Sequence, residues 1–240
     1  VTGVQTCALP ICHLIAGQNL KLNALQLQST GQIYAGNSAD LTVNQLQQYG
    51  QLAALNKINV QANTITSDKN AVWAAGLDSE GKLSNADATL TLDAQNVQIA
   101  GKILSGKQIQ IKAAQSTDLS LSESQAQNIN IATTELKTNN AKIIANQQLD
   151  LIATHNIDNE KGQYSAEQIN LNTAQLDNDQ GLIQHTGKNA FILDVANRID
   201  NNAGQIISNA DSTEIKTNTL NSKAGEILHA GDQQLKITAK

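Results

Sequence analysis

The sequence predicts an all-β fold, a right-handed parallel β-helix (a solenoid) of about ten coils with a repeat near 20 residues. Two observations carry this prediction. Aliphatic and polar side chains alternate in short runs, and these runs return at a nearly constant spacing. Alternation with period two is typical of strands, because successive side chains point to opposite faces. The windows between the runs are rich in Asn, Asp, Gly and Ser, which favour turns.

The repeating unit reads L-x-L-x-(A/T)-x-x-L-x-N-x-x-G-x-I-x-A in its clearest form. Successive copies are expected to open at Leu20, Leu41, Ile58, Leu90, Ile109, Ile129, Leu149, Ile169, Phe191, Thr213 and Leu235. The long step from Ile58 to Leu90 predicts an irregular or longer coil at about 66–89. One unit buries too few aliphatic side chains to offset its loss of backbone entropy, so the copies must stack and share one core.

Other repeat folds match less well. Leucine-rich repeats need L-x-x-L-x-L-x-x-N at about 20–29 residues, whereas here Ala or Thr follows the L-x-L run. A left-handed hexapeptide helix needs a six-residue sub-period, which the sequence does not show. Calcium-binding nonapeptides of the form G-G-x-G-x-D are absent from the sequence. The period itself does not fix the hand of the helix.

A glycine follows an inward aliphatic residue at a fixed distance in the second half of the chain. These glycines are Gly162, Gly181, Gly204 and Gly225, and each is expected at a tight corner that needs either a positive φ or close backbone approach. Asn159, Asn178 and Asn201 stand three residues before the first three of them. Their period-two position points inward, so we expect a structural ladder of stacked amides. The alternative is that they are turn asparagines facing water.

Composition excludes several classes of protein. The chain has 240 residues with net charge −5, 15% charged residues and 2% aromatic residues. Asn and Gln together number 54, which is more than a fifth of the chain. Nucleic-acid binding needs clustered basic residues, and the only arginine is Arg198. No apolar run approaches the ~18–20 residues of a membrane span, so the chain is expected to bind no nucleic acid and to span no membrane.

Residues 1–12, VTGVQTCALPIC, do not share the repeat pattern. They resemble an in-frame translation of a sequencing adapter, and we expect them to be an artefact, with the native segment at 13–240 and truncated at both ends. The segment holds Cys7, Cys12 and the only proline, Pro10. A redox pair or half a metal site at these cysteines is disfavoured, because no second Cys/His pair follows at zinc-like spacing.

The histidines and the tryptophan, which could bind a metal ion or a ligand, each have two interpretations. His155, His185 and His229 are interpreted as surface histidines rather than metal ligands, since His185 and His229 share a repeat position two coils, or about 10 Å, apart. Trp73 either covers an end or fills a widened coil, or it is an exposed binding residue.

The corner carboxylates also have two interpretations. Asp158, Asp177 and Asp200 fall at one repeat position, and Asp179 lies in the same turn as Asp177. They are either turn residues that bond the local backbone or a catalytic carboxylate pair.

From about Leu20 to Lys240 the chain resembles the repeat region of filamentous haemagglutinins and related two-partner-secretion exoproteins, including contact-dependent inhibition proteins. The resemblance lies in the L-x-L-x-A runs, the (L/I)-(D/N)-N-x-x-G corners at Leu176–Gly181 and Ile199–Gly204, and AVWAAGLDSEGKL at Ala71–Leu83. It implies a right-handed β-helix on the outer surface of a Gram-negative bacterium, exported by an outer-membrane transporter and facing a host or bacterial receptor.

The family resemblance therefore predicts a rod or stalk without catalysis, cofactor or metal in this segment. It leaves open whether the parent is an adhesin or a toxin-delivery stalk. The alternative function is a β-helix polysaccharide-degrading enzyme that uses the corner carboxylates. One arginine and few aromatic residues argue against it, because a sugar-binding groove needs basic and aromatic neighbours around its acids.

Overall fold

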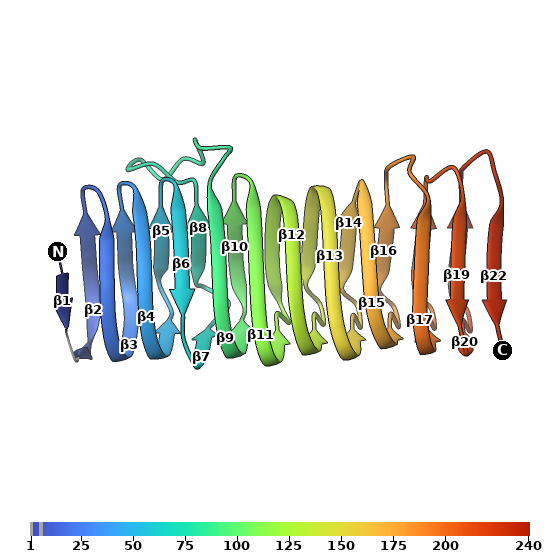
Figure 1. The fold of residues 1–240 in the computed structure, drawn as a ribbon, viewed down its shortest axis with the longest axis horizontal. Helices are drawn as coiled ribbons and strands as arrows, with labels where there is room; N and C mark the ends of the chain where they lie inside the picture. The colour runs from blue at the N-terminus through green and yellow to red at the C-terminus, as the bar shows by residue number, and fades with distance from the viewer. Residues whose placement is uncertain (1, 5–6) are drawn as a thin grey trace.

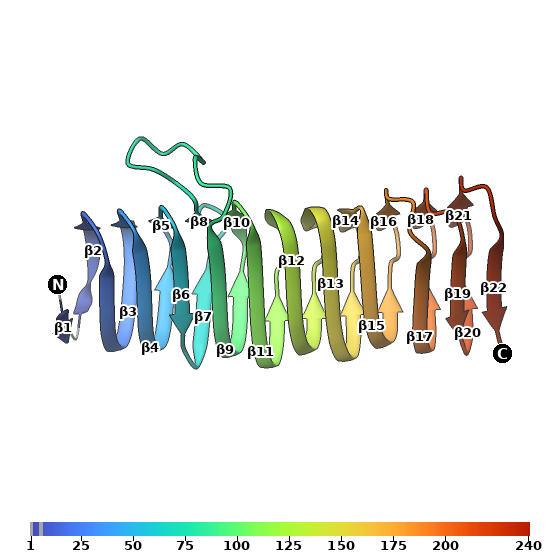
Figure 2. The same cartoon turned by 45° about the horizontal axis from the view of Figure 1, so that its top comes forward.

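The computed structural model describes the backbone of residues 2–4 and 7–240 and the side chains from His13 onward. Its strands all pair in parallel and stack as a β-solenoid of about 11 turns, which confirms the predicted fold class. Figures 1 and 2 show a straight rod with the strands across its long axis and the two termini at opposite ends. At ~4.8 Å per strand step, ten steps make a rod about 48 Å long.

Each coil has three faces, which we name A, B and C in chain order. In the first full coil, β3 (Leu20–Ala35) bends through all three. Face A is continued by β4 (Ser38–Gln48), β6 (Lys57–Gln61), β9 (Thr89–Ile99), β11 (Gln108–Asp118), β12 (Ser122–Lys137), β13 (Lys142–Asp158), β15 (Gln168–Asp177), β17 (Phe191–Asp200), β19 (Thr213–Thr217) and β22 (Leu235–Ala239).

Faces B and C use the remaining short strands together with parts of the long ones. Face B includes β7 (Thr64–Ser67) and β20 (Thr219–Asn221). Face C includes β5 (Gln51–Ala54), β8 (Val72–Ala75), β10 (Gly101–Ser105), β14 (Gln163–Ala166), β16 (Leu182–His185), β18 (Gln205–Ser208) and β21 (Glu226–His229). At the amino-terminal end, β1 (Thr2–Val4) pairs with face A of β3, and β2 (Cys7–Ala16) pairs with its faces B and C.

The inward aliphatic side chains form one continuous core along the rod. The strand register aligns Leu20, Ala39, Ile58, Leu90, Ile109, Ile129, Leu149, Ile169, Phe191, Thr213 and Leu235 in one row on face A. These are the expected openings of the repeat, with one correction. Ala39 rather than Leu41 pairs with Leu20, and Leu41 pairs with Leu22. The prediction was wrong there because an inward alanine gives a weaker hydrophobic signal than leucine.

Coil length changes along the rod because two corners change. Where face B meets face C, the early coils turn tightly, as at Gly50, whereas coils from Leu119 onward carry one more residue. Where face C meets the next face A, the last coils are longer again, since residues 186–190 lie between β16 and β17. Figure 1 shows these wider connections at the upper right of the rod.

One large insertion interrupts the pattern within the stretch 66–89. Strand β8 lies inside this stretch as a regular face-C strand, and the irregular part is residues 76–88. Figure 2 shows this loop standing clear of the coils between β8 and β9. Its Leu77 packs in an external apolar cluster with Tyr34, Ala53 and Ala74, which are outward positions of face C. The loop therefore covers an apolar strip that the coils alone would leave exposed.

None of the described residues forms a helix long and apolar enough to cross a membrane. The side chains of Cys7, Cys12 and Pro10 lie outside the part of the chain whose side chains are described.

Candidate functional site

The most organised polar feature of the rod is a buried ladder of amides at the corner between faces B and C. Asn159, Asn178 and Asn201 are fully buried and stand one above the other in successive coils. The Nδ2 atom of Asn159 donates to Oδ1 of Asn178 at 2.8 Å, and Nδ2 of Asn178 donates to Oδ1 of Asn201 at 2.7 Å. Because buried amides without partners are costly, this ladder ties three coils together along the rod axis.

Each ladder amide also holds its own turn. The Nδ2 atoms of Asn159, Asn178 and Asn201 donate to the carbonyl oxygens three residues later, at 3.4, 3.3 and 3.2 Å. In the same turns the backbone N–H of the glycine donates to the asparagine carbonyl at 3.0–3.1 Å. The asparagine therefore closes the corner from inside while it bonds to the next coil.

Other polar side chains complete the ladder at both ends. At one end the Thr138 hydroxyl lies 3.2 Å from Asn159 Oδ1 and 2.5 Å from the hydroxyl of Tyr164. Tyr164 is fully buried, and this burial raises the pKa of its hydroxyl. At the other end Asn201 Nδ2 donates to the Ser222 hydroxyl at 3.1 Å. The polar row therefore runs over five coils, from Thr138 to Ser222.

The corner glycines are explained by close approach and not by a positive φ. The positive φ in each turn belongs to the residue before the glycine: Lys161, Gln180, Ala203 and Ala224, at 52–57°. A Cβ atom on Gly181 would stand 2.5 Å from the carbonyl oxygen of Asn159 and 2.6 Å from Asn178 Oδ1. Gly162, Gly204 and Gly225 are similarly crowded, by ladder side chains and by the backbone of the preceding coil. The glycines thus leave the space that the ladder occupies.

The corner carboxylates line up on the outside of the same corner. Asp158, Asp177 and Asp200 are in register on adjacent coils of face B, about 4.8 Å per step. Partial burial, and then the nearby charges of Asp179, Asp158 and Asp200, raise the pKa of Asp177, against the backbone N–H of Asp179, which lowers it. A row of like charges with a raised pKa at its centre is the arrangement from which an acid–base pair could be built.

The hydrogen bonds of these carboxylates are those of turn residues. The Oδ1 atoms of Asp158 and Asp177 accept from the backbone N–H two residues later, at 3.3 and 2.9 Å. Asp200 is bound instead by Asn221 Nδ2 at 2.7 Å and by Arg198 Nε at 3.0 Å. The neighbouring basic group of Lys161 pairs with Glu160. These contacts satisfy the carboxylates locally, as Asx turns do.

The structure corrects the interpretation of one histidine. His185 is 1% exposed and stacks on Phe191, with ring centroids 5.0 Å apart, so it is a core residue and not a surface histidine. Its position two residues after the inward Ile183 places it on the inner side of face C. His185 and His229 do share a row, separated by Ser208, while His155 is exposed. Among the described residues no group of three or more His, Cys, Asp or Glu is placed to hold a metal ion.

Trp73 is fully buried in the regular core row of face C, between Leu52 and Ile103. It neither covers an end of the rod nor faces solvent; it fills the lengthened coil that holds the insertion of residues 76–88, which is one of the alternatives that the sequence offered. The next inward row of face C holds small residues, such as Ala54 and Ala75, and so leaves space for the large indole.

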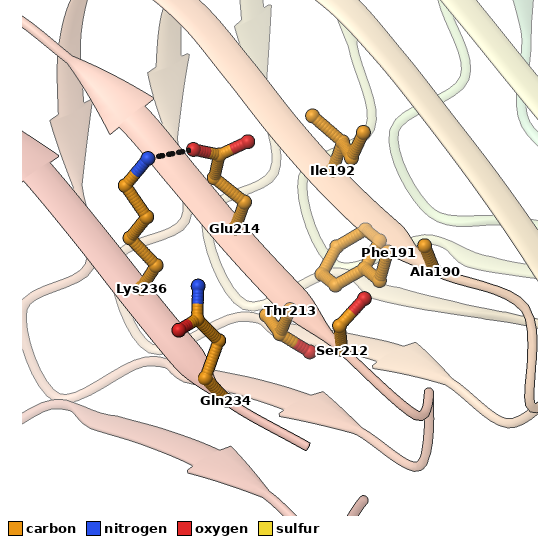
Figure 3. Close-up of a pocket in the computed structure, with 8 residues that line it drawn as sticks. All are labelled: Ala190, Phe191, Ile192, Ser212, Thr213, Glu214, Gln234 and Lys236. Carbon is orange, nitrogen blue, oxygen red and sulfur yellow. Dashed lines mark hydrogen bonds and ion pairs between the residues drawn. The ribbon is translucent and has the colours of Figure 1, made fainter.

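A shallow hollow of about 220 Å³ lies on face A near the carboxyl-terminal end, and Figure 3 shows its lining. Phe191 and Ile192 form one side and Gln234 and Lys236 the other, with Glu214 between them. The Glu214 carboxylate accepts from Lys216 and Lys236, each at 2.8 Å, and these bonds lower its pKa. The charged groups at the hollow therefore already neutralise one another.

A second amide ladder runs along the corner between faces C and A and was not predicted. Asn37 Nδ2 donates to Asn19 Oδ1 at 2.7 Å, Asn56 donates to Asn37, and Asn85 donates to Asn56, each at 2.5 Å. The signal was present, since asparagine recurs before the next face-A strand in these coils. Asn85 was hard to assign because the insertion of residues 76–88 breaks the spacing.

Comparison of the chain with protein-family models, with curated proteins and with solved structures finds no match in any of the three. The functional argument below therefore rests on the residues and the geometry described above.

Proposed function

We propose that the chain is a structural rod segment of a large secreted exoprotein of a Gram-negative bacterium, of the filamentous haemagglutinin or contact-dependent inhibition type. The rod carries other parts of its parent away from the cell surface and performs no catalysis itself. The observation that supports this most is the single core running along the rod, locked in three successive coils by a buried amide ladder. Such an arrangement makes a stiff spacer, because each coil rests on its neighbours.

The outer faces agree with a role in display. They carry amide rows in which side chains bond along the axis, such as Gln32 Nε2 to Gln51 Oε1 at 2.9 Å and Asn170 Nδ2 to Asp150 Oδ1 at 2.6 Å. Amides that bond to one another need no external partner and keep the rod hydrated. We propose an outer-membrane two-partner-secretion transporter as the partner during export and a host or bacterial surface receptor as the partner of the parent protein.

Export is the step that tests this proposal. The whole chain is placed behind the secretion domain of a filamentous haemagglutinin-type exoprotein and expressed with the matching transporter in a Gram-negative host. We expect the rod on the outer surface, stained by antibody on intact cells and resistant to added protease. A variant with Leu151→Asp, which puts a charge into the core, should reach the surface but be digested. Retention of the unaltered chain inside the cell would contradict the proposal.

The alternative function is polysaccharide cleavage, and the in-register row of Asp158, Asp177 and Asp200 is the observation that favours it. A panel of acidic and neutral polysaccharides incubated with the purified chain distinguishes the two. The rod proposal predicts no new reducing ends or unsaturated products. Turnover that Asp177→Asn abolishes, with the fold intact by circular dichroism, would support the enzyme instead.

A further inference from the structure

The last three coils differ from the rest of the rod at one inward position. This position is the second inward residue of face C. Through most of the rod it holds a small side chain: Ala35, Ala54, Ala75, Ser105, Ala126, Ala145 and Ala166. In the last three coils it holds His185, Ser208 and His229. The imidazole of His185 is buried in the core, whereas that of His229 is partly exposed.

The surroundings of His185 disfavour a protonated ring. It is 1% exposed, its Nδ1 atom is buried without a hydrogen-bond partner, and one side of its ring lies against Phe191. In a protonated imidazole both ring nitrogens carry a hydrogen, and each must donate it to an acceptor. Protonation would therefore place a charge on a buried ring whose Nδ1 atom has no hydrogen-bond partner, which is unfavourable.

No opposite charge is available to compensate. The side chains beside His185 in register are Ala166 on β14 and Ser208 on β18, and Phe191 on β17 stacks on it. None of these three is charged. Of the charged residues in the adjoining corners, Glu167 and Lys188 are exposed and Asp211 is partly exposed, and in the described part of the chain His185 forms no salt bridge with any of them. The nearest titratable group of the same row is His229, two coils away.

His229 has the opposite environment and serves as an internal reference. Its Nδ1 atom lies 3.0 Å from the Thr213 hydroxyl, and its Nε2 atom lies 3.2 Å from the carbonyl oxygen of Gln233. Both partners can accept a hydrogen bond, so neither ring nitrogen of His229 is left unpartnered, in contrast to Nδ1 of His185.

We propose that the carboxyl-terminal coils, residues 182–239, form an acid-sensitive unit that opens when His185 takes up a proton. The rod before residue 166 stays closed under the same conditions. Mild acidity would thereby expose strand edges in these coils while the preceding coils keep their stacking.

The direction of the effect follows from linkage. Burial, as the largest cause, lowers the pKa of His185 below its ordinary value of 6.5, although nearby backbone groups oppose the shift. Above pH 6.5 the imidazole is neutral in the closed and open states, and there is no penalty. As the pH falls below 6.5, the open state binds the proton first, so stability of these coils decreases. One such group raises the opening equilibrium by at most about tenfold per pH unit.

Hydrogen exchange of the full chain at pH 7.5 and pH 5.5, corrected for intrinsic exchange rates, tests the proposal. We expect peptides from 182–239 to lose protection by up to about tenfold at pH 5.5, and peptides from 90–166 to keep theirs. His185→Phe should remove the pH response. His185→Ala, which places at this position the residue found in most other coils, is the second variant if the phenylalanine does not fit.

Two controls make the outcome specific. His229→Gln and His155→Gln should each leave the acid response in place, because both ring nitrogens of His229 have hydrogen-bond partners and His155 is exposed. A response that persists in both His185 variants, one that is uniform along the rod, or one that disappears with His229→Gln would overturn the proposal.

Discussion

The same inward position at the corner between faces B and C is polar in both halves of the rod, with different results. In the amino-terminal half Ser29 and Gln48 are fully buried there, yet the Ser29 hydroxyl and both amide atoms of Gln48 have no hydrogen-bond partner. In the carboxyl-terminal half Asn159, Asn178 and Asn201 are equally buried and fully bonded. Burying a polar row therefore stabilises a solenoid only where the corner provides partners for it.

The difference arises in the backbone of the corner. The later corners hold one residue at positive φ followed by a glycine, as at Gln180 and Gly181, which brings the turn carbonyl over the asparagine amide. The earlier corner after Gln48 consists of Tyr49 and Gly50 only, and it offers no such carbonyl to the side chain. One extra residue per coil thus converts an unpaired polar position into a ladder.

The largest expected effect comes from breaking the centre of the ladder. Asn178→Leu removes the acceptor of one Asn159 Nδ2 hydrogen bond and leaves the Asn201 side-chain carbonyl oxygen without a partner, and we expect a loss of about 4 kcal/mol in the free energy of unfolding. The matched change Gln48→Leu removes amide atoms that have no partners, and it should stabilise by about 1 kcal/mol. Urea titration followed by circular dichroism measures both. Equal losses in the two variants would show that the ladder adds nothing specific.

A smaller loss is expected at the corner glycines. Gly204→Ala places a methyl group less than 3.0 Å from the Asn178 carbonyl oxygen and from Asn201 Oδ1, and should cost about 2–3 kcal/mol. Gly17→Ala is the control, because nothing lies within 4 Å of the added Cβ atom there. If the two substitutions are equally tolerated in thermal unfolding, close packing is not the reason for the glycines.

The smallest effect concerns the outer carboxylate row. Since partial burial, and then the neighbouring carboxylates, raise the pKa of Asp177 above the ordinary 3.8, the charged form is penalised once the pH exceeds that value. Asp177→Asn should therefore stabilise at pH 7 by at most about 0.5 kcal/mol, and the gain should vanish below pH 3.8. Asp118→Asn, in the same row but beside Lys137, should bring no gain. A gain for both, or one that persists at pH 3, would contradict this electrostatic explanation.

The sequence was sufficient for the fold class and for the row of positions that opens each coil, because strand periodicity and repeat spacing are local signals. Inward alanines were harder to assign from the sequence. Ala39 occupies the position expected for Leu41, because a small residue gives almost the same pattern whether it points inward or outward. His185 was missed although Ile183 fixes its side of the strand, since a polar residue type was taken as a sign of exposure. The packing of Leu77 over Tyr34 depends on how the loop 76–88 folds back, which no repeat pattern encodes.

The central claim is that successive copies of the repeat stand directly on one another in parallel. Spin labels on one outward row of face A test it, with Cys7 and Cys12 replaced by serine. Lys21, Gln110, Ile192 and Lys236 belong to this row.

The account predicts that pulsed electron–electron distances grow linearly with the number of coils, by ~4.8 Å each. The distance should be about 19 Å from Gln110 to Ile192, about 29 Å from Gln110 to Lys236 and about 48 Å from Lys21 to Lys236. Distances that fail to increase with coil number, or that scatter broadly, would contradict the stacked rod.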